Sequence, residues 1–574
     1  MSDGVLLISI PPAGIDIAYH DAAAHHPPLQ PPLGLFYLYC ALKREYPEIQ
    51  VSHLDLNICS GLCSTFTNYD DYTKFMEDAL KQYMEKPPQI IGISVNFTTS
   101  HVFFMLLAET ARNILPDCTI IAGGCHITAV GEYILENTDL ADYIICGEGE
   151  AVFPELCRRI LAGGRGIGDL SGVHWKGRIR KNAAGKLQAA ALPENIDLDF
   201  RLYPEFMDME FYASHSNFNS TLSVAPEKAN SFSVMASRGC PVGCSFCASA
   251  LMHGRRPRWR SLENISDEII WLHNTWRINC IIILDDNFVP ETKALDLFAM
   301  LRDLNIPELH MIVLNMSVNH TTKAIIDALS EAGIVDLSLA VESASPEMQK
   351  KIGKNLDMKK LEYLVQYAKS KDMLIKLFFM IGFPGESAES MRQTVALAKR
   401  LDVDWITCSI ATPFPGTKMY DEFVNLGYIK DSPEYWQANN SWMERLFDTE
   451  EISAKDISEM SFLAVLELNY GHVRLLREGK LDVAEAVYLN RVKSIKNQLF
   501  GFDMLRRIYA ERGDAIRQKM TIEHMKHLIR TDETARSYLK YADLLDDDIR
   551  NVLLIESLQA EGEEKPNGDV FAGK

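Results

Sequence analysis

The segment Arg238-Gly-Cys-Pro-Val-Gly-Cys-Ser-Phe-Cys247 carries three cysteines, separated by three residues and then by two. Cysteine thiolates are the usual protein ligands of iron–sulfur clusters. Three of them on one short loop can hold three irons of a 4Fe-4S cube and leave the fourth iron open. The proline and the glycine between the first two cysteines favour a tight turn. The spacing therefore predicts a 4Fe-4S cluster bound by Cys240, Cys244 and Cys247.

Two other interpretations of this loop stay open at this point. Zinc also binds cysteine, and His253 is available nearby to complete a site. Closed zinc sites usually take four ligands in two separated pairs, however, and no second pair stands near the loop. Chance spacing of three buried cysteines is the other alternative. The remaining cysteines are spread along the chain, mostly in apolar runs where a thiol acts as a small hydrophobic group.

The composition is that of an acidic globular protein. Of the 574 residues, 47 % are hydrophobic and 24 % are charged, which excludes a mainly disordered chain. The formal net charge of −20 repels phosphate backbones, so we expect no nucleic-acid partner. No uncharged apolar stretch approaches the roughly 18 residues of a membrane span, and the first apolar run is too short for a secretory signal. We therefore expect a cytoplasmic protein with no membrane span.

Upstream of the cysteine loop, short apolar strands alternate with amphipathic helices. The predicted strands cover residues 4–10, 51–56, 89–95, 118–122 and 143–146. The helices between them include 33–45, 70–85 and 102–114. This alternation predicts an α/β domain with a doubly wound, Rossmann-like parallel sheet, whose ligand binds at the carboxyl ends of the strands.

The same alternation returns from the loop onwards. The predicted strands cover residues 232–236, 280–284, 311–314, 337–341, 374–381 and 405–410, with helices such as 265–274, 293–304 and 322–332 between them. Six βα units predict a partial, TIM-like (βα)6 barrel with its site at the strand carboxyl ends. From residue 430 to 550 only helical spacing is found, which predicts an all-α domain that closes the site.

Changes of pattern give the domain boundaries. We expect the doubly wound domain over residues 1–165, a linker with a hairpin over 166–230, the barrel over 231–428, the helical domain over 429–559 and a disordered tail over 560–574.

At the cysteine loop the chain resembles the radical S-adenosylmethionine (radical SAM) superfamily. Its later motifs also match in order and spacing: Leu284-Asp-Asp-Asn-Phe288, Val341-Glu-Ser343, Met380-Ile-Gly-Phe-Pro-Gly-Glu386 and Pro413-Phe-Pro-Gly-Thr417. The resemblance implies that the open iron chelates SAM and that the reduced cluster cleaves it to methionine and a 5′-deoxyadenosyl radical. It also implies SAM contacts by residues on the loop and at strand ends: Phe246, Asp285, Asp286, Glu342, Ser343 and Gly382. A structural hydrogen bond or a packing role is the alternative for each side chain, and the turn itself is the alternative role of Gly382.

The first 165 residues resemble the cobalamin-binding domain that precedes the radical domain in one large subclass. The matching segments are Pro31-Pro-Leu-Gly-Leu35, Ile91-Gly-Ile-Ser94, Ala122-Gly-Gly-Cys-His126 and Gly147-Glu-Gly-Glu150. The resemblance implies cobalamin contacts by Ser94, Gly123, Gly124, His126, Gly147 and Glu148. A generic nucleotide-binding domain is the alternative, but no Gly-x-Gly-x-x-Gly follows the first strand.

One position departs from many cobalamin proteins, which carry Asp-x-His-x-x-Gly with a histidine below the cobalt. The corresponding segment here is Asp55-Leu-Asn-Ile-Cys-Ser60, so Asn57 stands in place of the histidine. The radical SAM subclass commonly lacks that histidine. The resemblance therefore implies cobalamin without a histidine ligand from this motif.

The resemblance implies a cobalamin-dependent radical SAM methyltransferase of the class B type. It would methylate an unactivated carbon, or a phosphinate, of a small-molecule or natural-product intermediate, using the 5′-deoxyadenosyl radical and methylcobalamin. Its cofactors would be a 4Fe-4S cluster, SAM and cobalamin, with an external electron donor such as flavodoxin or ferredoxin. No general acid or base is assigned. The alternatives are a non-methylating cyclase or rearrangement enzyme, a transfer-RNA methylthiolating enzyme and a non-enzymatic sensor.

Overall fold

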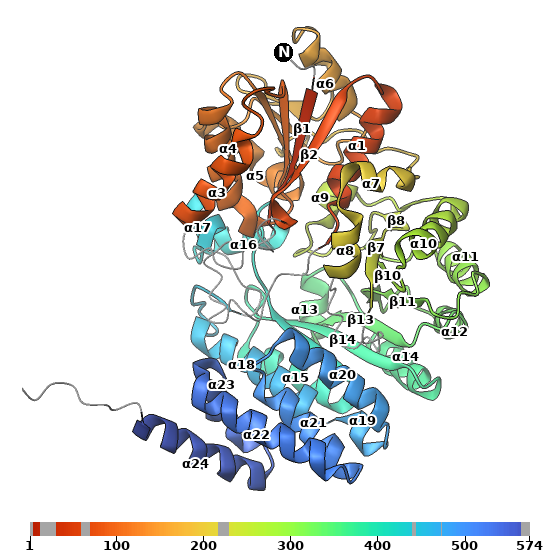
Figure 1. Cartoon of the computed structure of the whole chain (residues 1–574), viewed down its shortest axis with the longest axis vertical. Helices are drawn as coiled ribbons and strands as arrows, with labels where there is room; N and C mark the ends of the chain where they lie inside the picture. The colour runs from red at the N-terminus through yellow and green to blue at the C-terminus, as the bar shows by residue number, and fades with distance from the viewer. Residues whose placement is uncertain are drawn as a thin grey trace, which may run out of the picture.

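The computed structural model of the chain describes residues 4–11, 30–58, 69–215, 229–438, 444–471 and 473–563. Three parts follow one another along the long axis of the molecule (Figure 1). A sheet with helices on both faces lies at one end, a barrel-like set of strands lies in the middle, and a group of helices lies at the other end. None of the described helices combines the length and the apolar character needed to cross a bilayer.

The first domain has a six-stranded sheet in the order β2-β1-β3-β4-β5-β6. Its strands are β1 (Gly4–Ser9), β2 (Gln50–Asp55), β3 (Ile90–Ser94), β4 (Thr119–Gly123), β5 (Tyr143–Ile145) and β6 (Val173–His174). All neighbours are parallel except β5 and β6. The predicted parallel strands are thus confirmed, and β6 adds an antiparallel edge that the sequence analysis did not separate from the linker.

Alternate residues of β1 serve the two faces of this sheet, as a pleated strand requires. Val5 and Leu7 pack with α1 (Leu33–Glu45) and α6 (Phe153–Leu161). Leu6 and Ile8 pack under the helices of the opposite face: α3 (Tyr69–Lys81), α4 (His101–Ile114) and α5 (Cys125–Asn137). Because the strand order reverses at β1, a crevice opens between β1 and β3 at their carboxyl ends.

The linker after β6 contains two short antiparallel bridges, Trp175 with Arg178 and Lys181 with Leu187. The predicted hairpin is therefore present only as these two bridges. Two short helices follow, α7 (Tyr203–Phe206) and α8 (Met209–His215).

Six parallel strand positions form the open barrel. The strands are β7 (Ser231–Val234), β10 (Cys280–Ile283), β11 (His310–Val313), β12 (Met316–Ser317), β13 (Asp336–Glu342), β14 (Leu374–Ile381) and β15 (Trp405–Ile410). The third position is split, because β11 pairs with β10 whereas β12 pairs with β13. Asn315 stands at the break with a φ of 51°, which removes it from the strand conformation.

Helices cover the outside of this barrel. They are α10 (Leu262–Trp276), α11 (Glu291–Asp303), α12 (Lys323–Glu331), α13 (Pro346–Lys351), α14 (Met358–Ser370) and α15 (Ala388–Leu401). Ser261, Thr322 and Ser387 accept hydrogen bonds from the first turns of three of these helices, which fixes where each helix begins.

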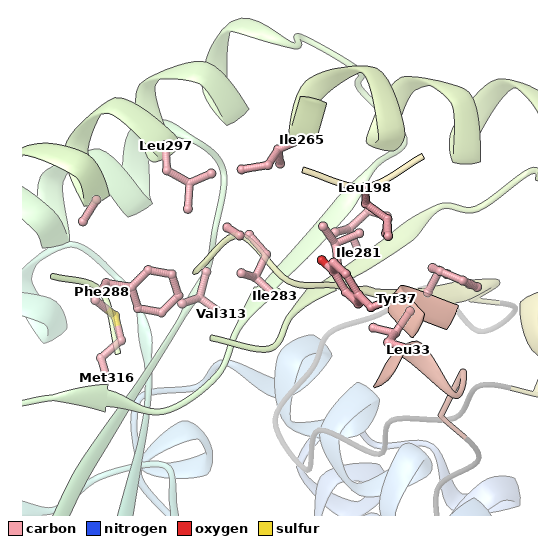
Figure 2. Close-up of a cluster of buried hydrophobic side chains, with 14 of the residues drawn as sticks. Leu33, Tyr37, Leu198, Ile265, Ile281, Ile283, Phe288, Leu297, Val313 and Met316 are labelled. Atoms are coloured by element: carbon pink, nitrogen blue, oxygen red, sulfur yellow. The ribbon is translucent and has the colours of Figure 1, made fainter. Parts of the chain in front are cut away.

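The first domain and the barrel share one apolar core. Leu33 and Tyr37 of α1 lie beside Leu198 and Ile281 in the same buried cluster (Figure 2). The chain also returns to the first domain after the barrel, since α17 (Pro433–Ala438) contacts α4. These contacts hold the carboxyl ends of the two sheets next to each other.

The C-terminal domain is helical, as predicted. Its elements are α18 (Ala454–Leu466), the π-helical turn η4 (Glu467–Gly471), α19 (Arg474–Arg477), α20 (Leu481–Ser494), α21 (Leu499–Glu511), α22 (Ala515–Thr531), α23 (Glu533–Ser537), the 3-10 helix η5 (Tyr538–Leu544) and α24 (Asp547–Glu563). Helix α24 extends into the segment predicted as a disordered tail, and residues 564–574 of that segment lie outside the described residues.

This domain seals one edge of the barrel. The side-chain amide of Asn469 donates to the Ile406 carbonyl at 3.0 Å and accepts from the Ile406 N–H at 2.8 Å. Ser461 donates to the Cys408 carbonyl at 2.5 Å. The unpaired backbone groups of edge strand β15 are thereby satisfied in place of a further strand.

A buried ion pair anchors the same domain. The guanidinium of Arg474 donates to both carboxylate oxygens of Asp404, at 2.9 and 2.7 Å, and to the Met373 carbonyl. Asp404 also accepts from the N–H of Ile375 in β14. The helical domain is therefore linked through one carboxylate to the interior of the barrel.

We predict that Asn469→Ala destabilises the protein by about 2 kcal/mol or more, because it leaves two buried backbone groups of Ile406 without partners. Calorimetry should show a lower unfolding temperature for this variant than for Asn551→Ala, which removes an exposed amide on α24. Equal unfolding temperatures for the two variants would contradict the edge-sealing role.

Candidate functional site

The three-cysteine loop joins β8 (Ser237–Arg238) to α9 (Ser249–His253) at the mouth of the barrel. Its first residue, Gly239, has a φ of 94°, and a Cβ there would lie 2.6 Å from the Arg256 carbonyl oxygen. Only glycine fits that position. The Gly239 N–H donates to the Asp286 carboxylate at 3.1 Å. The start of the loop is therefore fixed by the end of the neighbouring strand, β10.

The middle of the loop is held by two later segments of the barrel. The Ser245 N–H donates to the Ile352 carbonyl at 2.9 Å, and the Ser245 carbonyl accepts from the Met419 N–H at 3.0 Å. Backbone contacts on both sides of Ser245 thus set the conformation of the loop, independently of the side chains that it carries.

The thiols of this loop fit a metal cluster. Cys240 and Cys244 are half-buried, and Cys247 is exposed. Burial raises the pKa of Cys244 to about 12, and it also raises the pKa of Cys247, although an N–H from Ser249 opposes it there. Thiols with such pKa values become thiolates at pH 7 only when a cation binds them.

The geometry disfavours the zinc alternative. Within the described residues, no three His, Cys, Asp or Glu side chains converge as ligands of a single ion would. A 4Fe-4S cube instead places each cysteine on a different iron, so its ligands need not converge. His253, which the zinc site would need, has its Nδ1 2.7 Å from Glu148 Oε1.

The two aspartates at the end of β10 have different surroundings. Asp285 is buried and accepts from the Ala236 N–H at 2.8 Å and from the Ser237 hydroxyl at 2.5 Å. Burial raises the pKa of Asp285 to about 7. Asp286 lines the cavity described below and interacts electrostatically with Cys247. Of the pair, Asp286 is therefore the one placed to meet a ligand.

Glu342 lies next to the cysteine loop at the end of β13. Its φ of 70° turns the chain out of the strand, where the register with β14 shifts. The Glu342 carboxylate lies 2.7 Å from the buried ammonium of Lys354, and both groups interact electrostatically with Cys244. This ion pair holds a carboxylate beside the cluster ligands.

Three other predicted SAM residues are engaged within the protein. The hydroxyl of Ser343 lies 3.5 Å from Glu386 and 3.4 Å from Thr394. The Gly382 N–H donates to Glu386, and its carbonyl accepts from Arg445. The ring of Phe246 packs against Phe383, with 5.9 Å between centroids. Ser343 and Gly382 thus shape the turn after β14, and Phe246 packs beside it.

A cavity of about 340 Å³ lies between the first domain and the cysteine loop. Five residues expected at the cobalamin line it: Ser94, Gly123, Gly124, Gly147 and Glu148. The barrel contributes residues that follow β7 and β10 or lie in β8 and α9 to the opposite wall: Met235, Asp286, Arg238, Ser249, Met252 and His253. The carboxyl ends of both sheets therefore face one shared space.

Missing side chains make room in this cavity. A Cβ on Gly34 would meet nothing within 4 Å, and one on Gly123 would meet only the Ile145 carbonyl at 3.5 Å. Gly124 differs, because its φ is 97° and a Cβ would lie 2.5 Å from the Val95 carbonyl oxygen. Gly34 and Gly123 thus leave space for a ligand, whereas Gly124 is required by the backbone.

His126 does not line this cavity. It is buried, and its Nε2 lies 2.9 Å from Nδ1 of His101. The rings of both histidines stand edge-on to Trp436 of α17. Burial lowers the pKa of His126 to about 3 and that of His101 to about 4, so both rings are neutral at pH 7. The structure thus places His126 in a packing contact with α17.

Asn57 also lies outside the cavity wall. Its N–H donates to the carboxylate of Asp55, at 3.1 Å, and Tyr212 donates to the other oxygen of that carboxylate. The segment in which other cobalamin proteins carry the lower histidine is here tied to α8.

A buried carboxylate joins the two walls of the cavity. Glu148, 2 % exposed, accepts from Arg238 at 2.9 Å, from Arg258 at 2.5 and 2.9 Å and from His253 at 2.7 Å. Arg238 also donates to Glu150 at 2.7 Å. Because Arg238 stands two residues before the first cysteine, this network connects the Gly-Glu-Gly-Glu turn directly to the cysteine loop.

Two family models match the chain on the two sides of this cavity. The B12 binding domain matches residues 19–157, and the radical SAM superfamily matches residues 234–398. Together they span more than half of the chain. The chain belongs to the cobalamin-dependent radical SAM family. Its cofactors are SAM, a 4Fe-4S cluster and cobalamin.

Curated relatives of this radical SAM enzyme include methyltransferases. An uncharacterised methyltransferase of Pyrococcus horikoshii is 29 % identical over 430 residues, covering 74 % of this chain and 85 % of the relative. The cytidylyl-2-hydroxyethylphosphonate methyltransferase of Streptomyces wedmorensis is 24 % identical over 428 residues, covering 69 % and 78 %. An anaerobic magnesium-protoporphyrin IX monomethyl ester cyclase of Cereibacter sphaeroides is 23 % identical, covering 73 % and 64 %. These relatives therefore include both methyltransferases and a cyclase.

A solved structure shares the fold. The radical SAM methyltransferase TsrM from Kitasatospora setae, solved with cobalamin and a [4Fe-4S] cluster, matches with a TM-score of 0.55 at 20 % identity. The match covers 75 % of this chain and 76 % of TsrM. The likeness is one of fold.

Sequence reasoning missed several residues around the cofactor sites. Arg258 and Lys354 neutralise Glu148 and Glu342, and Cys125 lines the cavity near Cys247. A lone lysine or arginine carries no spacing signal, because its partner lies far away in the chain. Cys125 directly follows Gly123-Gly124, whereas no comparable motif marks Arg258 or Lys354.

We predict that Glu148→Gln lowers the free energy of unfolding by about 3 kcal/mol at pH 7, because it leaves buried guanidinium groups without a full counter-charge. Burial raises the pKa of Glu148, but hydrogen bonds from His253 and Arg258 and the charge of Arg238 outweigh it and lower the pKa to about 2. The stabilisation is therefore complete above about pH 4.5 and is lost as the pH falls towards 2.

Thermal unfolding between pH 7 and pH 4 would measure this difference. The difference in stability between wild type and Glu148→Gln should become smaller below pH 4.5. The control is Glu194→Gln, which breaks an exposed pair with Arg256 and should change stability by less than about 1 kcal/mol. A gap that does not depend on pH would contradict the role of the Glu148 charge.

We predict that Gly34→Leu weakens cobalamin binding about tenfold or more, because the new side chain occupies the open side of the cavity. The apoprotein should keep its stability, since leucine is a better helix former than glycine by about 0.8 kcal/mol. Equilibrium binding of hydroxocobalamin and thermal unfolding of the apoprotein measure the two effects. Wild-type affinity in this variant would place cobalamin elsewhere.

Proposed function

We propose that this enzyme methylates an unactivated carbon, or a phosphinate, of a small organic molecule. The observation that carries the proposal is one cavity lined both by the carboxyl end of the cobalamin-binding sheet and by Arg238 and Ser249, which flank the cysteine loop. A shared space lets a substrate reach both cofactors without moving between sites. The net charge of −20 supports a small-molecule substrate over a nucleic acid.

When bound, the cluster and SAM supply a 5′-deoxyadenosyl radical, and cobalamin supplies the methyl group. The protein holds Cys240, Cys244 and Cys247 as cluster ligands on a loop fixed by Asp286 and Ile352. The Glu148 network fixes the distance between this loop and the first domain. Apolar residues on both walls exclude water from the reacting groups.

The proposed SAM contacts are Glu342 and Asp286, since both are carboxylates that interact electrostatically with Cys247 at the cluster. A carboxylate there can accept hydrogen bonds from the SAM amino group or ribose hydroxyls. Lys354 limits the repulsion between Glu342 and the thiolates. The proposed role of four other residues is indirect, because each contacts protein groups rather than facing SAM: Phe246, Asp285, Ser343 and Gly382.

The proposed cobalamin contacts are the residues of the cavity floor: Ser94, Gly123, Gly124 and Gly147. Ser94 ends β3 and is placed to donate its hydroxyl. The proposed role of Glu148 is indirect, because its carboxylate oxygens are taken by arginine and histidine donors.

We propose a cytoplasmic enzyme reduced by an external donor such as flavodoxin or ferredoxin. The cluster needs reduced cysteine ligands, and a reducing compartment keeps them reduced. It also needs one electron from outside the chain, which a reduced donor protein in that compartment supplies. The ten described cysteines are all free thiols, which is consistent with that compartment.

A cyclisation or rearrangement without methyl transfer is the second candidate. The sequence similarity to a magnesium-protoporphyrin cyclase favours it. Both reactions would use the same cofactors. They differ in whether a methyl group from SAM appears in the product.

The test is anaerobic reconstitution with iron, sulfide and hydroxocobalamin, followed by incubation with SAM and a reductant. We expect four irons and one cobalamin per chain, together with formation of 5′-deoxyadenosine and S-adenosylhomocysteine. The triple variant of Cys240, Cys244 and Cys247 to alanine should keep cobalamin but lose iron and both products. Formation of 5′-deoxyadenosine without S-adenosylhomocysteine would contradict methyl transfer and favour the cyclase alternative.

A further inference from the structure

The side chain of Asn287 contacts Cys240, one of the predicted cluster ligands. The cysteine motif does not predict this contact. Its Nδ2 lies 3.8 Å from Sγ of Cys240 and 3.1 Å from Nδ1 of His320. We propose that Asn287 is a positioning residue that sets the reduction potential of the cluster through an N–H···S hydrogen bond to Cys240, with His320 holding its amide in place. The proposal rests on the cluster being bound by the cysteine loop.

The orientation of the Asn287 amide is determined by its neighbours. Its Oδ1 accepts from the N–H of Phe288 at 3.0 Å, so the nitrogen must face the other way. A flipped amide would place an oxygen against a thiolate and a nitrogen against an N–H donor, which are two repulsive contacts. Asn287 is only 2 % exposed, so water cannot replace either contact. The two hydrogens of the amide are thus directed at Cys240 and His320.

His320 is suited to accept from this amide. It follows β12, and its N–H donates to the Ser317 carbonyl at 3.1 Å, which ties it to the third strand position of the barrel. Burial and then the charge of Lys360 lower the pKa of His320. The ring is therefore neutral at pH 7, and its Nδ1 can act as an acceptor. Asn287 and His320 come from adjacent strand ends, so the barrel itself sets the direction of the amide.

The three thiols receive different support. Cys240 accepts a hydrogen bond from the side-chain amide of Asn287, and Cys247 accepts one from the backbone N–H of Ser249. Cys244 interacts electrostatically with Lys354. Only a proline would remove the backbone donor, and it would also restrict the chain conformation, while the lysine is already paired with a carboxylate. Asn287 is therefore the contact through which a side-chain change alters one ligand.

The expected effect on the cluster has a definite sign. The added electron of the reduced cluster increases the negative charge on its sulfur ligands. An N–H donor therefore stabilises the reduced form more than the oxidised form and raises the reduction potential. Loss of the donor should shift the potential to a more negative value, which makes reduction by an external donor harder.

The test is a redox titration, followed by electron paramagnetic resonance, of full-length protein reconstituted with iron and sulfide. Four variants are compared with wild type: Asn287→Ala, Asn287→Asp, His320→Leu and His320→Asn. Asn137→Ala is the control, because it removes an exposed amide on α5. Iron content is measured for every sample before titration.

We expect Asn287→Ala to keep its iron and to shift the midpoint potential to a more negative value. Asn287→Asp, which replaces the donor by a charged acceptor of the same shape, should shift it further. His320→Leu should give a smaller negative shift, whereas His320→Asn, whose Oδ1 can replace Nδ1, should restore the wild-type value. A potential that is unchanged in Asn287→Ala with full iron content would overturn the inference.

The design separates failure of this inference from failure of the cluster assignment. A wild-type protein that takes up no cluster would refute the assignment and the inference together. If Asn287→Ala alone loses iron, the comparison of His320→Leu with His320→Asn tests the inference instead, because both of these variants keep Asn287. A negative shift in His320→Leu that is absent in His320→Asn supports the inference, and equal potentials in the two overturn it.

Discussion

The buried carboxylate of Glu148 is the contact on which the geometry of the site depends. It comes from the turn after the fifth strand of the first domain, yet it is neutralised by Arg238 and Arg258 of the barrel. A buried charge without partners is costly, so the two domains cannot separate without exposing or stranding several charges. Because Arg238 leads directly into the cysteine loop, the network fixes the cobalamin-binding floor and the cluster ligands in one frame.

The barrel is open, and its two ends are completed by different parts of the chain. On the side of β7, helix α1 of the first domain adds Leu33 and Tyr37 to the barrel core (Figure 2). On the side of β15, the helical domain supplies Asn469 in place of a strand. The C-terminal helices thus stabilise an edge, while α17 returns to the first domain. The expectation that the helical domain closes the site stays a prediction.

Much of the fold follows from local sequence. The runs at β14 and β15 are mainly apolar, and their predicted limits coincide with the observed ones. The three cysteines needed only their spacing. Other features depend on partners that are distant in the chain: the break at Asn315, the antiparallel β6, and the pairing of Glu342 with Lys354.

The candidate site shows the same division. Glycine and serine residues at the carboxyl ends of the strands can be predicted to line the ligand site, because their position in the backbone places them at that edge of the sheet. Glu148 and His126 could not be placed from sequence, since a carboxylate or an imidazole serves a ligand or a buried network equally well. The structure assigns Glu148 to an ion network and His126 to a contact with His101 and Trp436.

The central claim is that both cofactors share one cavity held together by Glu148. Pulsed electron paramagnetic resonance on protein loaded with Co(II) cobalamin and the reduced cluster tests it most directly, because two paramagnets in one cavity couple magnetically. We predict a dipolar interaction in the wild type that becomes weaker or heterogeneous in Glu148→Gln. Two independent, uncoupled signals in the wild type would contradict the shared cavity.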